Sequence, residues 1–208
     1  MLENIRPMDI EKRSFEIITG LLGDRQLDPE NELVIKRAIH TTADFDYADN
    51  LVFSEHAVQK GLAALRSGCD IVTDTQMAKA GINKTILASL GGEVHCFMAD
   101  PDVAAEAKLR GVTRALVSME KAAALPKPCI FAIGNAPTAL LSLEHLMEEG
   151  KLSPALIIGV PVGFVNVVES KELILEGNRA PYIIARGRKG GSNVAAAICN
   201  AMLYQIRR

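Results

Sequence analysis

Short apolar runs alternate along this chain with stretches in which apolar residues recur every three to four positions. Five runs have the length of buried strands: CDIVTD, EVHCFM, PCIFAIG, PALIIGV and PYIIARG. The segments with helical spacing are MDIEKRSFEIITGLLG, DPENELVIKRAIH, SEHAVQKGLAALRSG, TQMAKAGI, DPDVAAEAKLRG, TRALVSMEKAAAL, PTALLSLEHLMEEG, ESKELILEG and SNVAAAICNAMLYQIRR. This alternation predicts an α/β fold with a mostly parallel sheet covered by helices on both faces.

Residues at the ends of several segments fit the rules for helix boundaries. Gly23 is a C-cap for the first helix, and Asp28 followed by Pro29 predicts the start of the second. A third helix is expected to begin at Ser54 and to stop at Gly68. No repeat or low-complexity linker divides the chain, so we expect a single domain over residues 1–208.

Composition and charge narrow the class of protein. With 208 residues, 49% of them hydrophobic, the chain can bury roughly two-thirds to three-quarters of its unfolded surface in one core. The net charge of −2 with interspersed signs gives no field for nucleic acid or a membrane surface. No run approaches the roughly 20 apolar residues of a membrane span, and the N-terminus has no signal-peptide core.

The four cysteines are Cys69, Cys96, Cys129 and Cys199. They are far apart and form no CxxC or Cys/His pair of zinc spacing, so we expect no metal site and no cofactor held by the chain. Free buried thiols are expected, which fits a reducing compartment, and the cytoplasm is the predicted location.

The loops after the strands are the candidate binding region, because ligands of open parallel sheets lie beyond the carboxyl ends of the strands. In RGRKGGSN, the cations Arg186, Arg188 and Lys189 flank glycines, and Gly190 and Ser192 precede or open the last helix. Cations beside a helix N-terminus favour an anionic ligand, although an ordinary solvated loop is the alternative.

Two further loops are candidates for anion contacts. GNAPTAL combines Asn135 and Thr138 with a helix start, but it is equally a well-made strand-to-helix turn. Arg114 also lies near a helix start. Neither loop has a dinucleotide or Walker pattern. Several loops that favour anions are expected at one edge of the sheet. This arrangement indicates a ligand with several acidic groups.

His40 ends an expected helix and is followed by Thr41, Thr42 and an acidic run in AIHTTADFDYADN. A histidine there is either a cap for the last carbonyl groups or a proton donor, since histidine titrates close to neutral pH. Spacing alone does not choose between these roles.

The stretch AIHTTADFDYADNLVFS resembles the signature of the precorrin-8X methylmutases, isomerases of vitamin B12 biosynthesis. IRPMDIEKRSFEII, which contains Ser14, and CDIVTDTQMAKAGI, GVTRALVSME, FAIGNAPTALLSL, IIGVPVGFVNVVESKE and IIARGRKGGSNVAAAICNAML are similar to family blocks in the same order. The similarity covers nearly the whole chain, and it implies that Ser14 in the first of these blocks contacts the substrate.

This resemblance implies a Rossmann-like sheet, a homodimer, and a tetrapyrrole held near the subunit interface. It implies transfer of a methyl group from C-11 to C-12 of precorrin-8X or cobalt-precorrin-8, without an external methyl donor, to give hydrogenobyrinate or cobyrinate. The catalytic histidine of the family falls on His40. Thr41 and Thr42 would orient the imidazole or contact carboxylates, and Asp44 would either fix the tautomer of the imidazole or only cap the helix. Any cobalt would be carried by the substrate.

Two other classes stay open on the sequence. A corrinoid carrier without catalysis would need the same contacts to carboxylates. An α/β hydrolase or a nucleotide-using transferase could reuse the GNAPTAL turn, but no nucleophile elbow and no Walker lysine support it.

Overall fold

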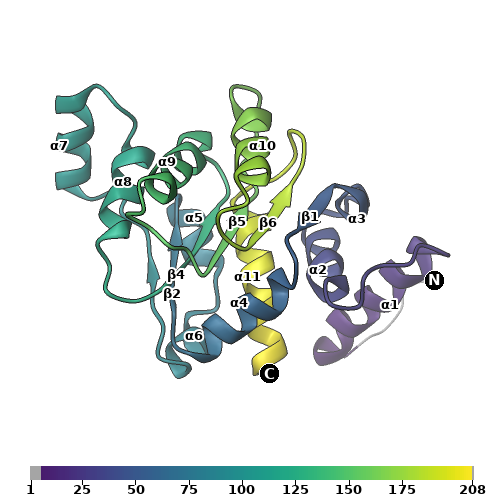
Figure 1. The fold of residues 1–208 in the computed structure, drawn as a ribbon. Coiled ribbons are helices and arrows are strands. Elements are labelled where there is room, and N and C mark those ends of the chain that lie inside the picture. The colour runs from purple at the N-terminus through teal and green to yellow at the C-terminus, as the bar shows by residue number, and fades with distance from the viewer. Residues whose placement is uncertain (1–5, 208) are drawn as a thin grey trace.

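The structure, a computed structural model, describes residues 6–207, and its six strands form one sheet (Figure 1). The strands are β1 (Leu51–Phe53), β2 (Asp70–Thr73), β3 (Val94–His95), β4 (Cys129–Ile133), β5 (Leu156–Gly159) and β6 (Tyr182–Ala185). Their order across the sheet is β1-β6-β5-β4-β2-β3. Residues 1–5 and 208 of the expected domain lie outside the described residues.

The predicted α/β fold with a mostly parallel sheet is confirmed. Every neighbouring pair of strands is parallel except β1 and β6, which pair antiparallel with Leu51 opposite Ala185. Strand β1 was not expected from the sequence, because Leu51–Phe53 follows the acidic run after His40 and becomes a strand only by pairing with β6.

Helices and one 3₁₀ turn connect the strands. They are η1 (Pro7–Asp9), α1 (Ile10–Leu22), α2 (Glu32–Thr42), α3 (Tyr47–Asn50), α4 (Ala57–Arg66), α5 (Gln76–Gly81), α6 (Lys84–Ser89), α7 (Pro101–Arg110), α8 (Arg114–Ala123), α9 (Pro137–Glu148), α10 (Val167–Gly177) and α11 (Ser192–Ile206). Among residues 6–207, every helix is too short or too polar to span a lipid bilayer.

The sheet separates two apolar cores, because successive side chains of a strand point to opposite faces. In β4, Ile130 and Ala132 pack into the core shared with α2, α4 and α11, whereas Phe131 and Ile133 pack into the core shared with α8, α9 and α10. All four side chains are fully buried. The sheet is therefore covered on both faces, as the continuous apolar runs predict.

Two predicted helix boundaries are wrong. Helix α2 begins at Glu32, not at Asp28, because the Asp28 carboxylate accepts hydrogen bonds from Glu30 and Asn31 in a separate turn. Helix α4 begins after His56, and the Ser54 hydroxyl instead accepts the backbone N–H of Tyr182. In both places, the side chain that was expected to cap the helix makes a different hydrogen bond.

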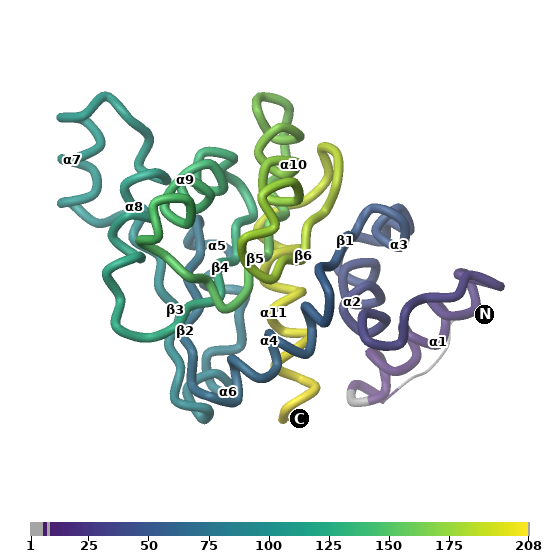
Figure 2. The backbone as a smooth tube through the Cα atoms, in the orientation of Figure 1, coloured from purple at the N-terminus to yellow at the C-terminus, as the bar shows by residue number. Residues whose placement is uncertain are grey.

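The N-terminal segment closes one side of the molecule. Helix α1 lies at the outer edge beside α2, and the trace then passes through α3 into β1 (Figure 2). Helix α2 packs against the C-terminal helix α11. Because β1 runs opposite to β6, the residues before β1 lie at the carboxyl end of β6, where the Arg186 N–H donates to the Asn50 carbonyl.

Candidate active site

The loops after β5 and β6 lie against each other at the carboxyl edge of the sheet. The N–H of Gly191 donates to the carbonyl oxygen of Val160 over 2.9 Å, and that of Gly163 to the carbonyl oxygen of Arg188 over 3.2 Å. A Cβ atom on Gly190 would lie 2.1 Å from the Val160 carbonyl oxygen, so only glycine fits there.

The loops after β2 and β4 join the same surface through Ser192. Its hydroxyl lies 2.8 Å from the hydroxyl of Thr75, which begins α5. A Cβ atom on Gly134 would lie 2.7 Å from the Ser192 Cα atom. Four strand-to-helix loops therefore form one continuous rim, which is where a ligand is expected in a parallel sheet.

His40 lies in the last turn of α2 with its side chain exposed. Its ring meets the edge of the Phe15 ring, with centroids 5.6 Å apart and planes at 89°. Ser14, the preceding residue of α1, donates its hydroxyl to the Ile10 carbonyl over 2.9 Å. Within the described part of the chain, the imidazole has no hydrogen-bond partner, so its nitrogens are available to a ligand.

The residues after His40 cap the helix. The Thr42 hydroxyl donates to the Ala38 carbonyl over 2.8 Å and accepts the N–H of Asp44 over 3.2 Å, and the helix ends at Ala43 in a left-handed conformation. Thr41 is exposed. The hydroxyl of Thr42 is therefore used by the backbone, which leaves Thr41 as the freer of the two threonines.

Asp44 does not hold the imidazole as the sequence suggested. One of its oxygens accepts the Asp46 N–H over 3.0 Å, and the other lies 2.6 Å from the Lys189 ammonium. Lys189 also pairs with Asp46 at 2.6 Å. These bonds lower the pKa of Asp44 and raise that of Lys189. The expected tautomer-fixing bond is absent from the described residues, but the same ion pairs join the His40 segment to the cationic loop.

The three cations of that loop differ in their availability. Lys189 is paired with two aspartates, and Arg186 lies 3.1 Å from Glu172. Arg188 is exposed, and no carboxylate of the described chain pairs with it. Arg188 is therefore the cation most available to an anionic ligand.

Arg114 and Thr138 come together at the neighbouring corner of the rim. Arg114 is the first residue of α8 and is exposed. Its N-cap, Thr113, lies 3.0 Å from the hydroxyl of Thr138 at the start of α9. The two helix starts therefore present one arginine and two hydroxyls side by side.

The backbone N–H groups of the GNAPTAL turn already bind a carboxylate side chain of the protein itself. The buried Asp74 carboxylate, directly after β2, accepts the N–H groups of Gly134, Asn135 and Ala136 over 2.8, 2.8 and 2.6 Å. Burial raises the pKa of Asp74, and the three amide donors oppose this by lowering it. A ligand at this turn would meet only the side chains of Asn135 and Thr138, and the amides are not free for a phosphate.

Comparison with known proteins decides the family. The family model of the precorrin-8X methylmutases matches residues 9–205. The chain belongs to that family. It is 46% identical to the cobalt-precorrin-8 methylmutase of Salmonella typhimurium, with 97% of each chain covered. It is 45% identical to that of Priestia megaterium, with 95% of this chain and 88% of the relative covered.

A solved structure agrees with this membership. A precorrin-8X methylmutase from Thermus thermophilus is 38% identical and superposes with a TM-score of 0.85, covering 94% of this chain and 96% of the other. The methylmutase described here is thus an isomerase of cobalamin biosynthesis that transfers a methyl group within one molecule. The resemblance of the sequence motifs is confirmed.

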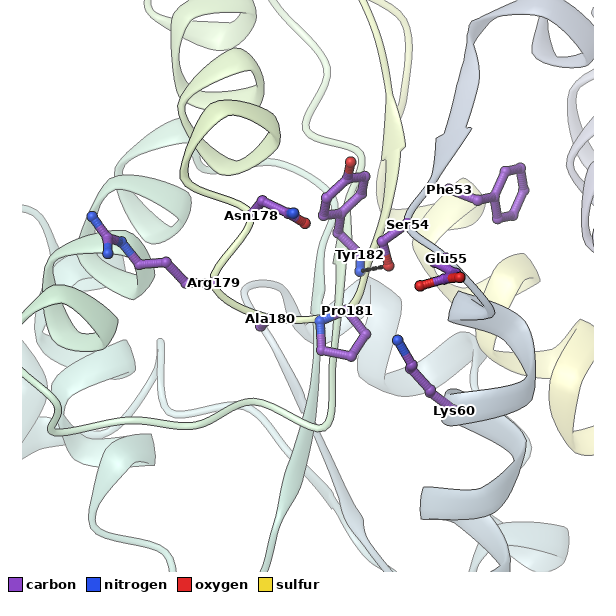
Figure 3. A pocket seen from close by; sticks show the side chains of 9 residues that line it. All are labelled: Phe53, Ser54, Glu55, Lys60, Asn178, Arg179, Ala180, Pro181 and Tyr182. Atoms are coloured by element: carbon purple, nitrogen blue, oxygen red, sulfur yellow. Dashed lines mark hydrogen bonds between the residues drawn. The ribbon is translucent and has the colours of Figure 1, made fainter.

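Two hollows of this methylmutase lie away from the rim. One, of about 420 Å³, is lined by residues at the end of β1 and the start of β6, among them Tyr182, and by Lys60 of α4 (Figure 3). Since β6 begins there, this hollow opens at the opposite edge of the sheet. Another, of about 760 Å³, lies between α8 and α9.

Three features of the methylmutase rim were missed in the sequence. Asp74 and Lys171 are buried polar residues whose partners lie far along the chain, so no local pattern marks them. The third is an apolar loop after β5, in which Val162, Phe164 and Val165 are 46%, 84% and 78% exposed. The run VPVGFV was a visible signal, because so many apolar residues rarely occur together in a solvated loop.

Proposed function

We propose that this methylmutase moves the methyl group from C-11 to C-12 of cobalt-precorrin-8 or precorrin-8X, with His40 donating a proton to the macrocycle. The observation that carries this role is the position of His40, which is exposed and unpartnered within the described chain and tied through Asp44 and Lys189 to the cationic loop. A pigment anchored by its carboxylates at that loop would place its ring beside the imidazole.

The proposed chemistry needs positioning and a proton, and no strong nucleophile. Protonation draws electron density through the conjugated system, the C-11–methyl bond breaks as the C-12–methyl bond forms, and the proton is returned to His40. Atoms therefore balance for an isomerisation. In the metal-free ring a nitrogen can take the proton, whereas in a cobalt ring, whose nitrogens are occupied, the conjugated carbon framework would take it.

We propose that the acetate and propionate groups of the substrate bind Arg188 and Arg114, with the side chains of Asn135, Thr138 and Ser192 as hydrogen-bond donors. The free guanidinium of Arg188 and the two joined helix starts at Arg114 support this assignment, because arginine matches the planar geometry of carboxylates. Lys189 and Arg186, which are paired within the protein, hold the rim in shape.

The exposed apolar loop would cover the uncharged surface of the macrocycle. Phe164 and Val165 lie in the segment that donates the Gly163 N–H to Arg188, so apolar and cationic groups are adjacent on the rim. A flat ring with charged substituents requires both. Aromatic side chains also supply large contact areas for such rings.

The two curated relatives described above are named for cobalt-precorrin-8, which favours a cobalt-containing substrate for this chain as well. We propose that the metal is carried by the macrocycle and that the chain holds no cofactor of its own. We further propose a homodimer in the cytoplasm. The exposed side chains of Phe164 and Val165 support a dimer, because a second subunit would cover the solvent-facing side of that loop and of the pigment.

The test is single-turnover conversion of cobalt-precorrin-8, and in parallel of precorrin-8X, followed by the visible spectrum of the pigment. We expect His40→Ala to bind product but to convert substrate about 10²–10⁴-fold more slowly, the usual contribution of a general acid. His145→Ala, which removes an exposed imidazole from α9, is the matched control. Full turnover by His40→Ala refutes the histidine role, and binding without turnover by the native protein identifies a carrier.

A further inference from the structure

Helix α10 contains a lysine that is completely enclosed by the protein. Lys171 has no exposed surface and neighbours the buried residues Val167, Ser170 and Ile174 on its own helix. Lysine is almost never fully buried without a partner, because removing an ammonium group from water is costly. The burial of Lys171 is explained by the groups that its ammonium contacts.

The ammonium group holds the cationic loop by its backbone. The Lys171 Nζ donates to the carbonyl oxygens of Gly187 and Lys189 over 2.8 and 3.0 Å. No carboxylate of residues 6–207 pairs with it, and burial alone lowers its pKa to about 8. The positive charge under the loop is thus not neutralised within the described subunit.

Most charged side chains near Lys171 form ion pairs with other residues. In the loop, Arg186 pairs with Glu172 of α10, and Lys189 pairs with the aspartates after α2. On α9, Glu144 pairs with Arg179 near the far end of α10. The remaining carboxylates on α10 are Glu169 and Glu176, and β6 carries no charged side chain. Arg188 is the remaining charge of the loop, and it is a cation.

The two bonds also fix the direction of two amides. In a trans peptide the carbonyl and the N–H point in opposite directions, and the described chain contains no cis peptide. Because the carbonyls of Gly187 and Lys189 face Lys171, the N–H groups of Arg188 and Gly190 face away from it. Neither N–H has a partner among the described residues. Free N–H groups within one turn of the backbone are able to bind an anion.

We propose that Lys171 is a positioning residue, which turns the N–H groups of Arg188 and Gly190 toward one carboxylate of the pigment and keeps a positive charge behind them. This inference rests on the proposed function. The Arg188 guanidinium, the two amides and the buried ammonium would then act on the same carboxylate. An anion bound there favours the charged form of Lys171, so binding takes up protons where that lysine is partly neutral.

The experiment is calorimetric titration of the native protein with cobyrinate at pH 8 and at pH 6.5, each in two buffers of different ionisation enthalpy. We expect Lys171 to take up a fraction of a proton per site at pH 8 and little at pH 6.5. His40→Ala should keep the uptake at pH 8. Lys171→Met, which preserves the apolar stem, should lose it and bind about 10- to 100-fold more weakly, as expected for a lost charged hydrogen bond.

The outcomes separate this inference from the proposed function. Native binding without proton uptake at pH 8 refutes the role of Lys171 and leaves the methylmutase assignment intact, even if Lys171→Met does not fold. If a folded Lys171→Met protein binds cobyrinate as tightly as the native protein and takes up as many protons, the role of Lys171 is likewise refuted and the methylmutase assignment stays intact. If the native protein binds no cobyrinate at all, the proposed function fails together with this inference.

Discussion

Replacing Asp74 tests whether an internal carboxylate holds the turn after β4. The side chain is 1% exposed and accepts three backbone N–H groups at 2.6–2.8 Å. A hydrogen bond to a charged group contributes about 1.5–3 kcal/mol, so the gross interaction is about 4.5–9 kcal/mol. Burial of the carboxylate, which raises the pKa of Asp74, offsets part of this.

For Asp74→Ala we expect a net loss of about 3–4 kcal/mol in the free energy of unfolding, because water can reach only some of the freed amides. In a chain of this length that lowers Tm by about 6–16 °C. Asp74→Asn is the matched variant. Its single carbonyl oxygen can still accept the amides of Asn135 and Ala136, so we expect roughly half the loss.

The assay is urea denaturation, repeated with sodium formate, which is small enough to replace the missing carboxylate. Formate at ten times its Kd should restore about 1.4 kcal/mol to Asp74→Ala, with a much smaller effect on the native protein. An Ala variant within 1 kcal/mol of the native stability would refute the reasoning, and so would equal stabilisation of both proteins by formate.

The remaining predictions concern the rim and the cysteines. Gly190→Ala should weaken cobyrinate binding by about 10²-fold, because its Cβ would displace the loop from Val160, whereas Gly111→Ala, with positive φ but open space, should bind normally in the same titration. Burial raises the pKa of Cys199 to about 12, against 9.0 in the unfolded chain. The unfolded state therefore loses its thiol proton first, and stability should fall as pH rises through 9. Urea midpoints at pH 8 and 10 should decline less steeply in Cys199→Ala; equal slopes would contradict the prediction.

Most of the architecture could be predicted from the sequence, because strand and helix patterns depend on neighbours in the chain. Strands β2 to β6 and most of the helices follow directly from apolar spacing, whereas the short helices α3 and α6 were not predicted. Strand β1 could not be predicted in this way, since Leu51–Phe53 becomes a strand only by pairing with β6. All four cysteines are buried and free, as expected.

The candidate site was predictable in its location and less so in its contacts. His40 and the cationic loop were both found as motifs, and the ion pairs of Lys189 with Asp44 and Asp46 join the segment that follows His40 to that loop. The pairing of Lys189 with Asp44, and that of Asp74 with the GNAPTAL turn, depend on partners 60 or more residues away, and Arg186 pairs with Glu172 of the preceding helix. A sequence pattern identifies groups suited to anions but does not reveal when the protein neutralises them itself.

The reversed direction of β1 has a consequence for biosynthesis of the chain. Because β1 pairs only with β6, and α2 packs against α11, the histidine-bearing segment has no final support until the last strand and helix have left the ribosome. During translation, residues 1–50 cannot reach their final packing before β6 and α11 have been synthesised. A chain without β6 and α11 would therefore leave β1 unpaired, and only β5, β4, β2 and β3 could form a sheet.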